Sequence, residues 1–225
     1  MNDKKTLKKA IIFNSIIFGL EVLCVAWMMS GFMIFPEEVL TAKKIQAFIF
    51  FTVDSNVLMG IVALISLIEE IKVYKGLKEE VSKVSLILYL VGSVGVTLTM
   101  LVTVFYLTPI VAPDKGVFAL FKNANLFFHL INPILSIVVL VLFKRNKRID
   151  FVHTFTGVIP MVLYGIFYLV NGIVHMENGV VPKQYDWYLF YAYGFKSIFI
   201  VFPVMLSFTY LISFVLWKIN RIKIE

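Results

Sequence analysis

The sequence predicts an all-α membrane protein, a single domain over residues 1–225 built as a bundle of six transmembrane helices. Of its 225 residues, 60% are hydrophobic and only 16% are charged, whereas soluble domains contain about 45–50% apolar residues. A run of roughly 20 apolar residues crosses the hydrocarbon core of a bilayer. Six such runs are present: Ala10–Phe35, Ala47–Ile68, Val84–Leu107, Asn125–Phe143, Phe155–Val174 and Ser197–Trp217.

The segments around these runs support the assignment in order. The first run follows MNDKKTLKK, but it is too long for a signal peptide and lacks a small-x-small cleavage site. The third run contains LVGSVGVTLTM, whose small residues permit close helix packing. The stretch 175–196, before the last run, is rich in Tyr and Trp. Such residues are typical of the lipid headgroup region, and the stretch is also long enough to cover a cavity.

The basic residues predict the orientation of the bundle. Fifteen of the 21 Lys and Arg residues lie before the first run or after the second, fourth and sixth runs. Because cytoplasmic segments of membrane proteins are enriched in Lys and Arg, we expect both termini in the cytoplasm. The net charge of +7 is then a topology signal, and we expect no nucleic-acid partner.

With a single cysteine, Cys24, no cysteine-based metal cluster is expected, and we expect no metal or cofactor.

Polar residues collect near the outer ends of three runs. Thr52 lies roughly 8 Å below the outer boundary of the second run at the helical rise of about 1.5 Å per residue, and His129 in the fourth run reaches a similar depth. Polar groups inside a membrane usually face the bundle interior or a water-filled cavity. We therefore expect a shared polar layer. Residues that share a helical face in it are Thr52, Ser55 and Asn56, then Asn125, His129 and Asn132, then Tyr164, Tyr168, Asn171 and His175.

Two acidic residues do not fit this layer directly. Asp54 points away from the face of the second run that carries Thr52. Glu21 lies midway along the first run, where an unpaired charge is costly, so it is either protonated or bonded to a partner. Its role is that of a relay residue or of a structural clasp.

The pairing of Thr52 with His129 indicates hydrolytic chemistry. A threonine hydroxyl becomes a nucleophile when a base takes its proton, and imidazole suits that role near neutral pH. Because N–H groups inside a helix are already bonded, we expect the oxyanion of the reaction to be stabilised by side chains. Candidates for contacts with the substrate or the oxyanion are Asn56, Ser55, Asn132, Tyr168, Asn171, His175, Glu21 and Asp54.

Three segments resemble a known group of proteins. FFTVDSNVLMGIVALISL is similar to the FT-x-x-SN helix of small six-helix bacterial integral membrane proteins, LFFHLINPILSIVVLVLF to their H-x-x-x-P helix, and PMVLYGIFYLVNG with the Tyr-rich segment to the remainder. These proteins are related to the androgen-induced protein and ADTRP family of transmembrane threonine hydrolases, which cleave fatty acid esters of hydroxy fatty acids. Asp54 replaces an expected neutral residue, and YDWYLFYAYGF lacks the proline-rich form of the bacterial relatives.

The resemblance implies a lipid-ester hydrolase of lipid metabolism, with Thr52 as the nucleophile and His129 as the base. It also implies a membrane lipid or long-chain fatty acyl ester as substrate and a place in the bacterial plasma membrane. Two other functions stay open. A small transporter or proton relay would use Glu21, Asp54 and His129, and a scaffold without chemistry would use the polar layer only to join helices.

Overall fold

The structure, a computed structural model, describes residues 4–35, 44–144 and 149–221. These residues form helices, apart from loops and one isolated bridge between Glu177 and Val180. In chain order the elements are α1 (Lys4–Ser30), η1 (Lys44–Ile49), α2 (Phe51–Tyr74), α3 (Lys83–Val102), η2 (Thr103–Leu107), α4 (Thr108–Lys115), η3 (Ala119–Phe121), η4 (Phe127–Ile131), α5 (Asn132–Val138), η5 (Val139–Phe143), η6 (Phe151–Val158), α6 (Ile159–Val174), η7 (Lys183–Tyr185), η8 (Phe195–Ser197) and α7 (Ile198–Arg221).

Joined end to end, these elements give the long helices of a membrane protein. Within the described ranges, five helices are long and apolar enough to cross a membrane: Lys4–Ser30, Phe51–Tyr74, Lys83–Lys115, Phe151–Val174 and Phe195–Arg221. A shorter apolar helix, Phe127–Phe143, joins η4, α5 and η5. The predicted all-helical class is confirmed, and five of the six predicted runs lie in helices long enough to span a membrane.

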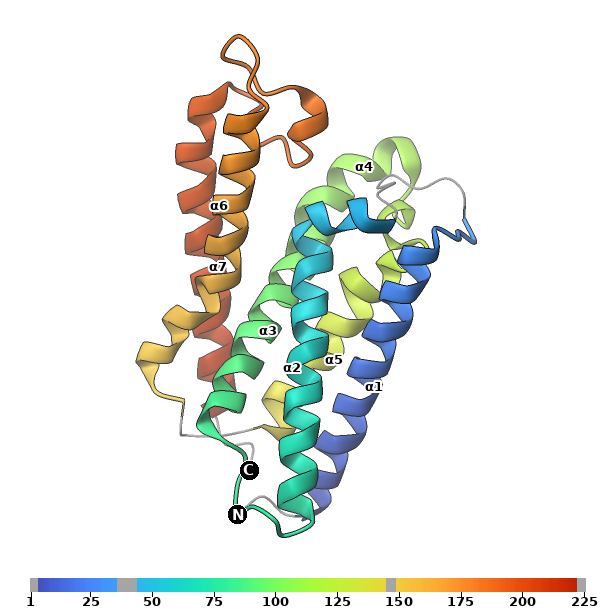
Figure 1. Ribbon diagram of the computed structural model, residues 1–225, viewed down its shortest axis with the longest axis vertical. Coiled ribbons are helices and arrows are strands. Elements are labelled where there is room, and N and C mark those ends of the chain that lie inside the picture. The colour runs from blue at the N-terminus through green and yellow to red at the C-terminus, as the bar shows by residue number, and fades with distance from the viewer. Residues whose placement is uncertain (1–3, 36–43, 145–148, 222–225) are drawn as a thin grey trace.

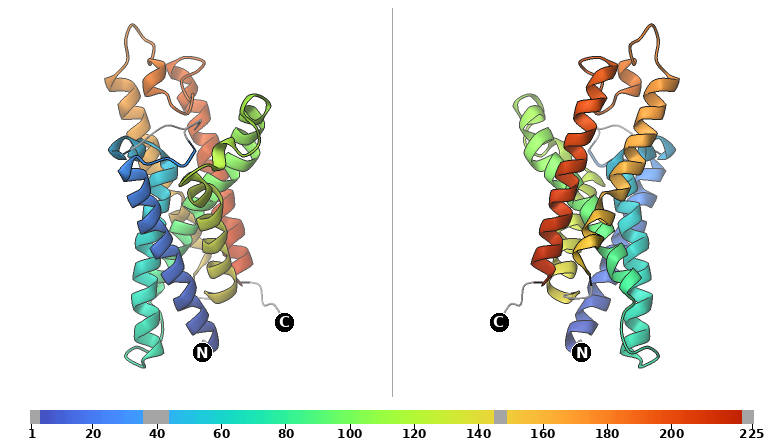
Figure 2. Two further views of the ribbon diagram at one scale, coloured as in Figure 1. Left: turned by 90° about the vertical axis from the view of Figure 1, so that its right-hand side faces the viewer. Right: turned by 90° about the vertical axis from the view of Figure 1, so that its left-hand side faces the viewer.

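The helices lie side by side and alternate in direction (Figure 1). α3 lies in the middle, in contact with α2, α5 and α7, while α1 and α2 flank it on one side and α6 and α7 on the other (Figures 1 and 2). α1 begins and α7 ends at the same end of the bundle, which we call the terminal end. The opposite end is called the pocket end.

Glycine residues of α3 allow α2 to approach closely. A Cβ atom added at Gly92 would lie 3.0 Å from the sulfur of Met59, and one added at Gly95 would lie 3.2 Å from the Cβ of Ser55. The two helices also share a hydrogen bond between the hydroxyls of Ser55 and Thr99, 3.1 Å apart. The small residues of the third run therefore pack against α2, as such residues do in membrane helices.

A proline fixes the contact between α2 and the shorter helix. Pro133 has no N–H group, so it cannot bond to the Phe128 carbonyl, five residues earlier in this π-helical turn. The N–H of Asn132 is already bonded to the carbonyl of Phe127. The Phe128 carbonyl instead accepts from Nδ2 of Asn56 at 3.1 Å. The carbonyl that Pro133 leaves without a backbone donor therefore takes part in a hydrogen bond between two helices.

The second helix begins later than its apolar run. We predicted a start at Ala47, but α2 begins at Phe51, and η1 lies across its end (Figure 1). Phe50 between them is extended, with φ −95° and ψ 132°. Hydropathy does not separate these parts, because η1 and Phe50 are themselves largely apolar. Thr52 is therefore the second residue of the helix, rather than one and a half turns inside it.

Most of the basic groups used for the orientation lie at the terminal end, at the start of α1 and the ends of α2 and α7 (Figure 1). Lys144 differs from the prediction, which placed it in a solvated loop. It is buried, and its Nζ lies 2.5 Å from Oε1 of Glu70. Four members of the basic set lie outside the described residues: Arg145, Lys147, Arg148 and Lys223.

Candidate functional site

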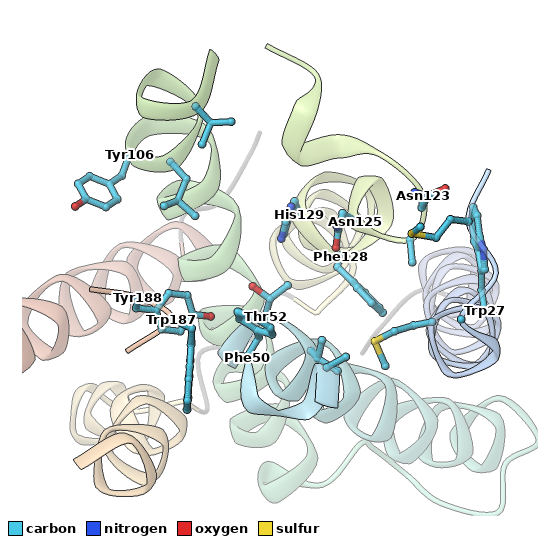
Figure 3. A pocket seen from close by; sticks show the side chains of 18 of the residues that line it. Trp27, Phe50, Thr52, Tyr106, Asn123, Asn125, Phe128, His129, Trp187 and Tyr188 are labelled. Atoms are coloured by element: carbon cyan, nitrogen blue, oxygen red, sulfur yellow. The ribbon is translucent and has the colours of Figure 1, made fainter. Parts of the chain in front are cut away.

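A pocket of about 350 Å³ opens at the pocket end of the bundle. Its walls come from α1, α2, η2, α4, η4 and the segment 187–189 (Figure 3). Most of the lining is apolar. Both Thr52 and His129 are among the residues that line the pocket. The labelled lining residues are Trp27, Phe50, Thr52, Tyr106, Asn123, Asn125, Phe128, His129, Trp187 and Tyr188. The two residues that were expected at one depth thus line one pocket.

His129 is held in a single tautomer by the main chain. Its Nδ1 lies 2.7 Å from the carbonyl oxygen of Leu120. A carbonyl only accepts hydrogen bonds, so Nδ1 carries the proton and Nε2 keeps its lone pair. The ring is buried and makes an edge contact with Phe121, with 6.3 Å between ring centroids. This arrangement orients Nε2 as a hydrogen-bond acceptor, the state that a general base requires.

Thr52 lies in the first turn of α2, where backbone donors are available. The first N–H groups of a helix have no partner one turn earlier, and Phe50 at the N-cap supplies no side-chain cap. Its carbonyl accepts from the N–H groups of Val53 and Asp54, at 3.1 and 3.3 Å. The N–H groups of Phe51 and Thr52 come before those of Val53 and Asp54, so they have no acceptor one turn earlier within α2. Our expectation that the N–H groups around Thr52 are used inside a helix is therefore wrong.

The hydroxyl of Tyr188 lies over this helix start (Figure 3). Burial raises the pKa of Tyr188 to about 12, while contacts with the hydroxyl of Thr52 and the N–H groups of Phe51 and Thr52 hold it lower. At neutral pH the phenol is protonated and is able to donate. Sequence reasoning missed Tyr188, because nothing in the Tyr-rich segment distinguishes one tyrosine from the next.

Trp187, Tyr188 and Leu189 line the pocket, so part of the Tyr-rich segment covers a cavity. Two contacts with α6 hold the segment in place. The hydroxyl of Tyr168 donates to Oδ1 of Asp186 at 2.5 Å and accepts from the N–H of Tyr188 at 3.2 Å.

The other two predicted residues of α6 act on the same segment. Nδ2 of Asn171 donates to the carbonyl of Tyr185 at 3.0 Å, and the ring of His175 stacks on Tyr185 with 3.7 Å between centroids. Neither residue lines the pocket, and neither does Tyr168. These three side chains position the cover rather than reaching the Thr52 hydroxyl.

The three residues predicted to share a polar face of α2 do not all reach the pocket. Ser55 bonds to Thr99 of α3, and Asn56 bonds to the carbonyls of Thr52 and Phe128, at 2.8 and 3.1 Å. Both are fully buried below the pocket, because the helix begins only at Phe51 and its second turn already packs inside the bundle. Only Thr52 of this face reaches the pocket.

Asp54 lies on another side of α2, as its helical phase requires. It lines a separate groove of about 270 Å³ with residues of α6. It is an acidic residue in the first turn of α2, where a negative charge interacts favourably with the helix dipole. Asp54 and Thr52 therefore face different cavities.

Glu21 is bonded to a partner, one of the two possibilities considered for it. Nδ2 of Asn132 donates to its Oε1 at 2.7 Å, and both side chains are buried. Neither lines the pocket. A second buried glutamate, Glu70, forms a cluster with Asn14 and Lys144 that sequence reasoning also missed. The polar Asn14, seven residues before Glu21 on the same helical face, was the available signal.

No family model matches the chain, and neither a curated protein nor a solved structure resembles it. Across the ranges that the structure describes, no group of three or more His, Cys, Asp or Glu side chains is placed to hold a metal ion. Fold and site together define a helical membrane protein with a largely apolar pocket at one end. That pocket contains a hydroxyl, an oriented imidazole and a helix start.

Proposed function

We propose that the protein is an intramembrane lipid-ester hydrolase in which Thr52 is the nucleophile and His129 the general base. The observation that supports this proposal is that both side chains line one pocket with mainly apolar walls. Acyl transfer needs a nucleophile, a base and donors for the oxyanion. The pocket offers a hydroxyl, the lone pair of Nε2, and the donors at the start of α2.

In the first half of the reaction, Nε2 of His129 takes the proton of the Thr52 hydroxyl as its oxygen attacks the ester carbonyl carbon. The carbonyl oxygen becomes an oxyanion. When this intermediate collapses, the bond to the alcohol oxygen breaks, and the imidazolium protonates the departing alcohol. The product is an acyl-threonine. The bond from Nδ1 to Leu120 keeps the ring oriented, a task that a carboxylate performs in other hydrolases.

In the second half, a water molecule gives a proton to Nε2 and attacks the acyl carbon. The Thr52 oxygen leaves with the proton that the imidazolium returns, and the fatty acid is released. The side chains of Thr52 and His129 are not hydrogen-bonded to each other in the structure, and catalytic hydrogen bonds often shorten only when substrate is bound. Substrate binding is therefore part of assembling the site.

Two groups beside Thr52 suit the oxyanion. The Tyr188 hydroxyl is protonated at neutral pH, and the N–H of Thr52 belongs to the first helical turn. The positive end of the α2 dipole stabilises negative charge at the same place. This set replaces the side chains of Asn56, Asn132, Asn171 and Tyr168 considered from sequence, which are engaged elsewhere.

The walls favour a long-chain acyl ester that enters from the lipid. We infer six membrane spans by counting the shorter helix Phe127–Phe143, and a cytoplasmic terminal end because Lys and Arg are enriched on the cytoplasmic side of membrane proteins. The pocket then lies in the outer leaflet of a bacterial plasma membrane. Trp187, Tyr188 and Leu189 cover it at the headgroup level, where Trp and Tyr are favoured.

The test uses purified protein in detergent, a fluorophosphonate probe and a long-chain ester of a hydroxy fatty acid. Thr52→Ala and His129→Ala should lose labelling and at least about 10³-fold in turnover, since removal of a nucleophile or base has effects of that size or larger. Tyr188→Phe should lose about 10²-fold, as for removal of one oxyanion donor.

Matched controls are Thr156→Ala and His153→Ala, which change a threonine and a histidine at the terminal end of the bundle. Both should keep labelling and turnover. Hydrolysis that survives in the Thr52 and His129 variants would contradict the proposal.

A transporter is the second candidate, and the buried Glu21 favours it because intramembrane carboxylates often mark ion or proton paths. Flux of a solute into liposomes that stops in Glu21→Gln, with no ester hydrolysis by the parent protein, would select this function. If neither activity is found and Thr52→Ala changes only stability, the polar layer serves helix packing alone.

A further inference from the structure

Below the pocket, three buried side chains each keep an oxygen without a hydrogen-bond donor. Among the described residues four buried side-chain atoms lack a partner, and three of them are Oε2 of Glu21, Oδ1 of Asn56 and Oδ1 of Asn132; the fourth is Oγ1 of Thr97 in α3. The three side chains are 3%, 0% and 0% exposed. Buried polar atoms are almost always satisfied, and those that are not need an explanation.

Contacts bring the three side chains into one meeting point of α1, α2 and α5. Asn132 of α5 bonds to Glu21 of α1 at 2.7 Å. Gly60 of α2 packs on the same Glu21, since a Cβ added there would lie 3.0 Å from the Cβ of Glu21. Asn56 is one helical turn before Gly60, and it bonds to Phe128, one turn before Asn132. The three residues therefore start from backbone positions within about one helical pitch, 5.4 Å, of one another along the bundle.

The chemistry of the three oxygens favours a cation over another acceptor. The amide nitrogen of Asn56 donates to two carbonyls, those of Thr52 and Phe128. The amide nitrogen of Asn132 donates to the carboxylate of Glu21. The opposite orientation of this amide would place its oxygen against a carboxylate oxygen, which is unfavourable. Both amides thus present oxygen to the site. Across the described ranges, Glu21 has no ion pair with Lys, Arg or His.

We propose that Glu21, Asn56 and Asn132 bind a monovalent cation, Na⁺, between α1, α2 and α5. Hard cations take carboxylate and amide oxygens as ligands, and the coupling-ion sites of membrane transporters lie near the middle of the bilayer. One carboxylate and two neutral oxygens match a single positive charge.

The position of the cation gives it a structural effect on the pocket. Asn56 follows Thr52 by one turn of α2, and Asn132 follows His129 by about one turn of the shorter helix. A cation held by both asparagines would tie together the two helices that carry Thr52 and His129. Binding itself needs neither of these two side chains, so it is independent of the proposed hydrolysis.

The test is thermal unfolding of the purified protein in detergent at pH 7.5, with NaCl replaced by choline chloride at constant ionic strength. Tm should rise with Na⁺ in a saturable way, by about 5 °C when Na⁺ is one hundred times its Kd. Glu21→Gln, which keeps the size and the bond from Asn132, should lose this response. Asp150→Asn, an exposed carboxylate in the described chain, and Thr52→Ala should both retain it.

Equilibrium dialysis of the unmodified protein with radioactive Na⁺ provides a second measurement that does not depend on a variant folding. One Na⁺ per chain, displaced by unlabelled Na⁺, is expected. Equal Tm values in Na⁺ and choline without saturable binding would overturn the proposal, and so would a Na⁺ response that persists in Glu21→Gln. A Tm that rises as pH falls and ignores Na⁺ would show that a proton neutralises Glu21, which also overturns it.

Discussion

Two buried glutamates, Glu70 and Glu21, have opposite surroundings. Near the terminal end, Glu70 accepts hydrogen bonds from Nζ of Lys144 at 2.5 Å and from Nδ2 of Asn14 at 3.1 and 2.9 Å. Nearer the pocket, Glu21 accepts one bond, from Asn132. One carboxylate has a cation and two satisfied oxygens, while the other has no ion pair with a described residue and one oxygen without a donor.

Two contacts with Tyr89 complete the hydrogen-bonded cluster around Glu70. The hydroxyl of Tyr89 donates to Oδ1 of Asn14 at 3.0 Å, and the ammonium of Lys144 lies over the Tyr89 ring, 4.4 Å from its centroid. A fully satisfied network makes a rigid connection between helices, whereas a partly satisfied one leaves binding capacity. The Glu70 cluster is thus a satisfied connection between helices, while the region around Glu21 keeps unsatisfied acceptors.

Removing the cation at Glu70 should have the largest effect on stability. Lys144→Met leaves a buried carboxylate unpaired, and such a change costs about 3–5 kcal/mol. Unfolding in detergent, followed by tryptophan fluorescence, measures it. Lys78→Met is the matched control, because the pair with Glu69 is partly exposed and its loss should cost about 1 kcal/mol or less. Equal losses would mean that the Glu70 cluster is not the stronger connection.

A change at Gly60 tests how tightly Glu21 is packed. In Gly60→Ala the new methyl group would lie 3.0 and 3.2 Å from the Cβ and Cγ of Glu21, and overpacking of this kind costs about 1–3 kcal/mol. Gly19→Ala in α1 is the control, since an added Cβ meets nothing within 4 Å there. Its higher helix propensity should add up to about 1 kcal/mol. Melting curves that shift in the same direction for both would contradict this packing.

Neutralising Glu21 should change stability much less than removing Lys144. Without Na⁺, Glu21→Gln keeps an acceptor for Asn132 and removes an unpaired buried charge, so it should not lower the free energy of unfolding by more than about 1 kcal/mol. The same isosteric change at Glu70 takes the counter-ion from Lys144 and should be far more costly. Denaturation of the two variants in choline buffer compares them. A Glu21→Gln protein as unstable as Glu70→Gln would show that the surroundings are equivalent.

The smallest effect is expected at an ion pair in water. The ammonium of Lys83, which bonds to Asp150 at 2.7 Å, lowers the pKa of that carboxyl. A lowered pKa stabilises the fold above the ordinary value of about 3.9, and this contribution is lost as pH falls through the folded pKa. The Tm difference between the parent protein and Lys83→Met should therefore be small at neutral pH and shrink toward zero as pH falls below the ordinary carboxyl pKa of about 3.9. A difference that grows in acid would contradict the assignment.

Much of the fold follows from the sequence, because lipid imposes long apolar helices and each span shows as a hydropathy run. Helical phase also separated Asp54 from Thr52, and the two residues do face different cavities. Phase depends only on the position along one helix, so a single sequence contains it. The same reasoning placed Thr52 and His129 on helices that meet, although their chemical roles stay a prediction.

What the sequence could not predict depends on contacts between distant segments. Lys144 pairs with Glu70 across 74 positions of the sequence. Because further basic residues follow Lys144 in the sequence, nothing in the pattern distinguishes it as buried. Tyr188 reaches the start of α2 only because Tyr168 and Asp186 hold its segment. The late start of α2 was also hidden, since an apolar 3₁₀ segment and an apolar helix have the same hydropathy.

The shorter helix Phe127–Phe143 has a consequence for the surrounding lipid. Its 17 residues cover about 25 Å at 1.5 Å per residue, less than the hydrocarbon thickness of about 30 Å. As a membrane span, a helix of this length would create hydrophobic mismatch, to which a bilayer responds by thinning beside the helix. Since this helix carries His129 on a wall of the pocket, thinning beside it would bring water and headgroups toward the proposed site of hydrolysis.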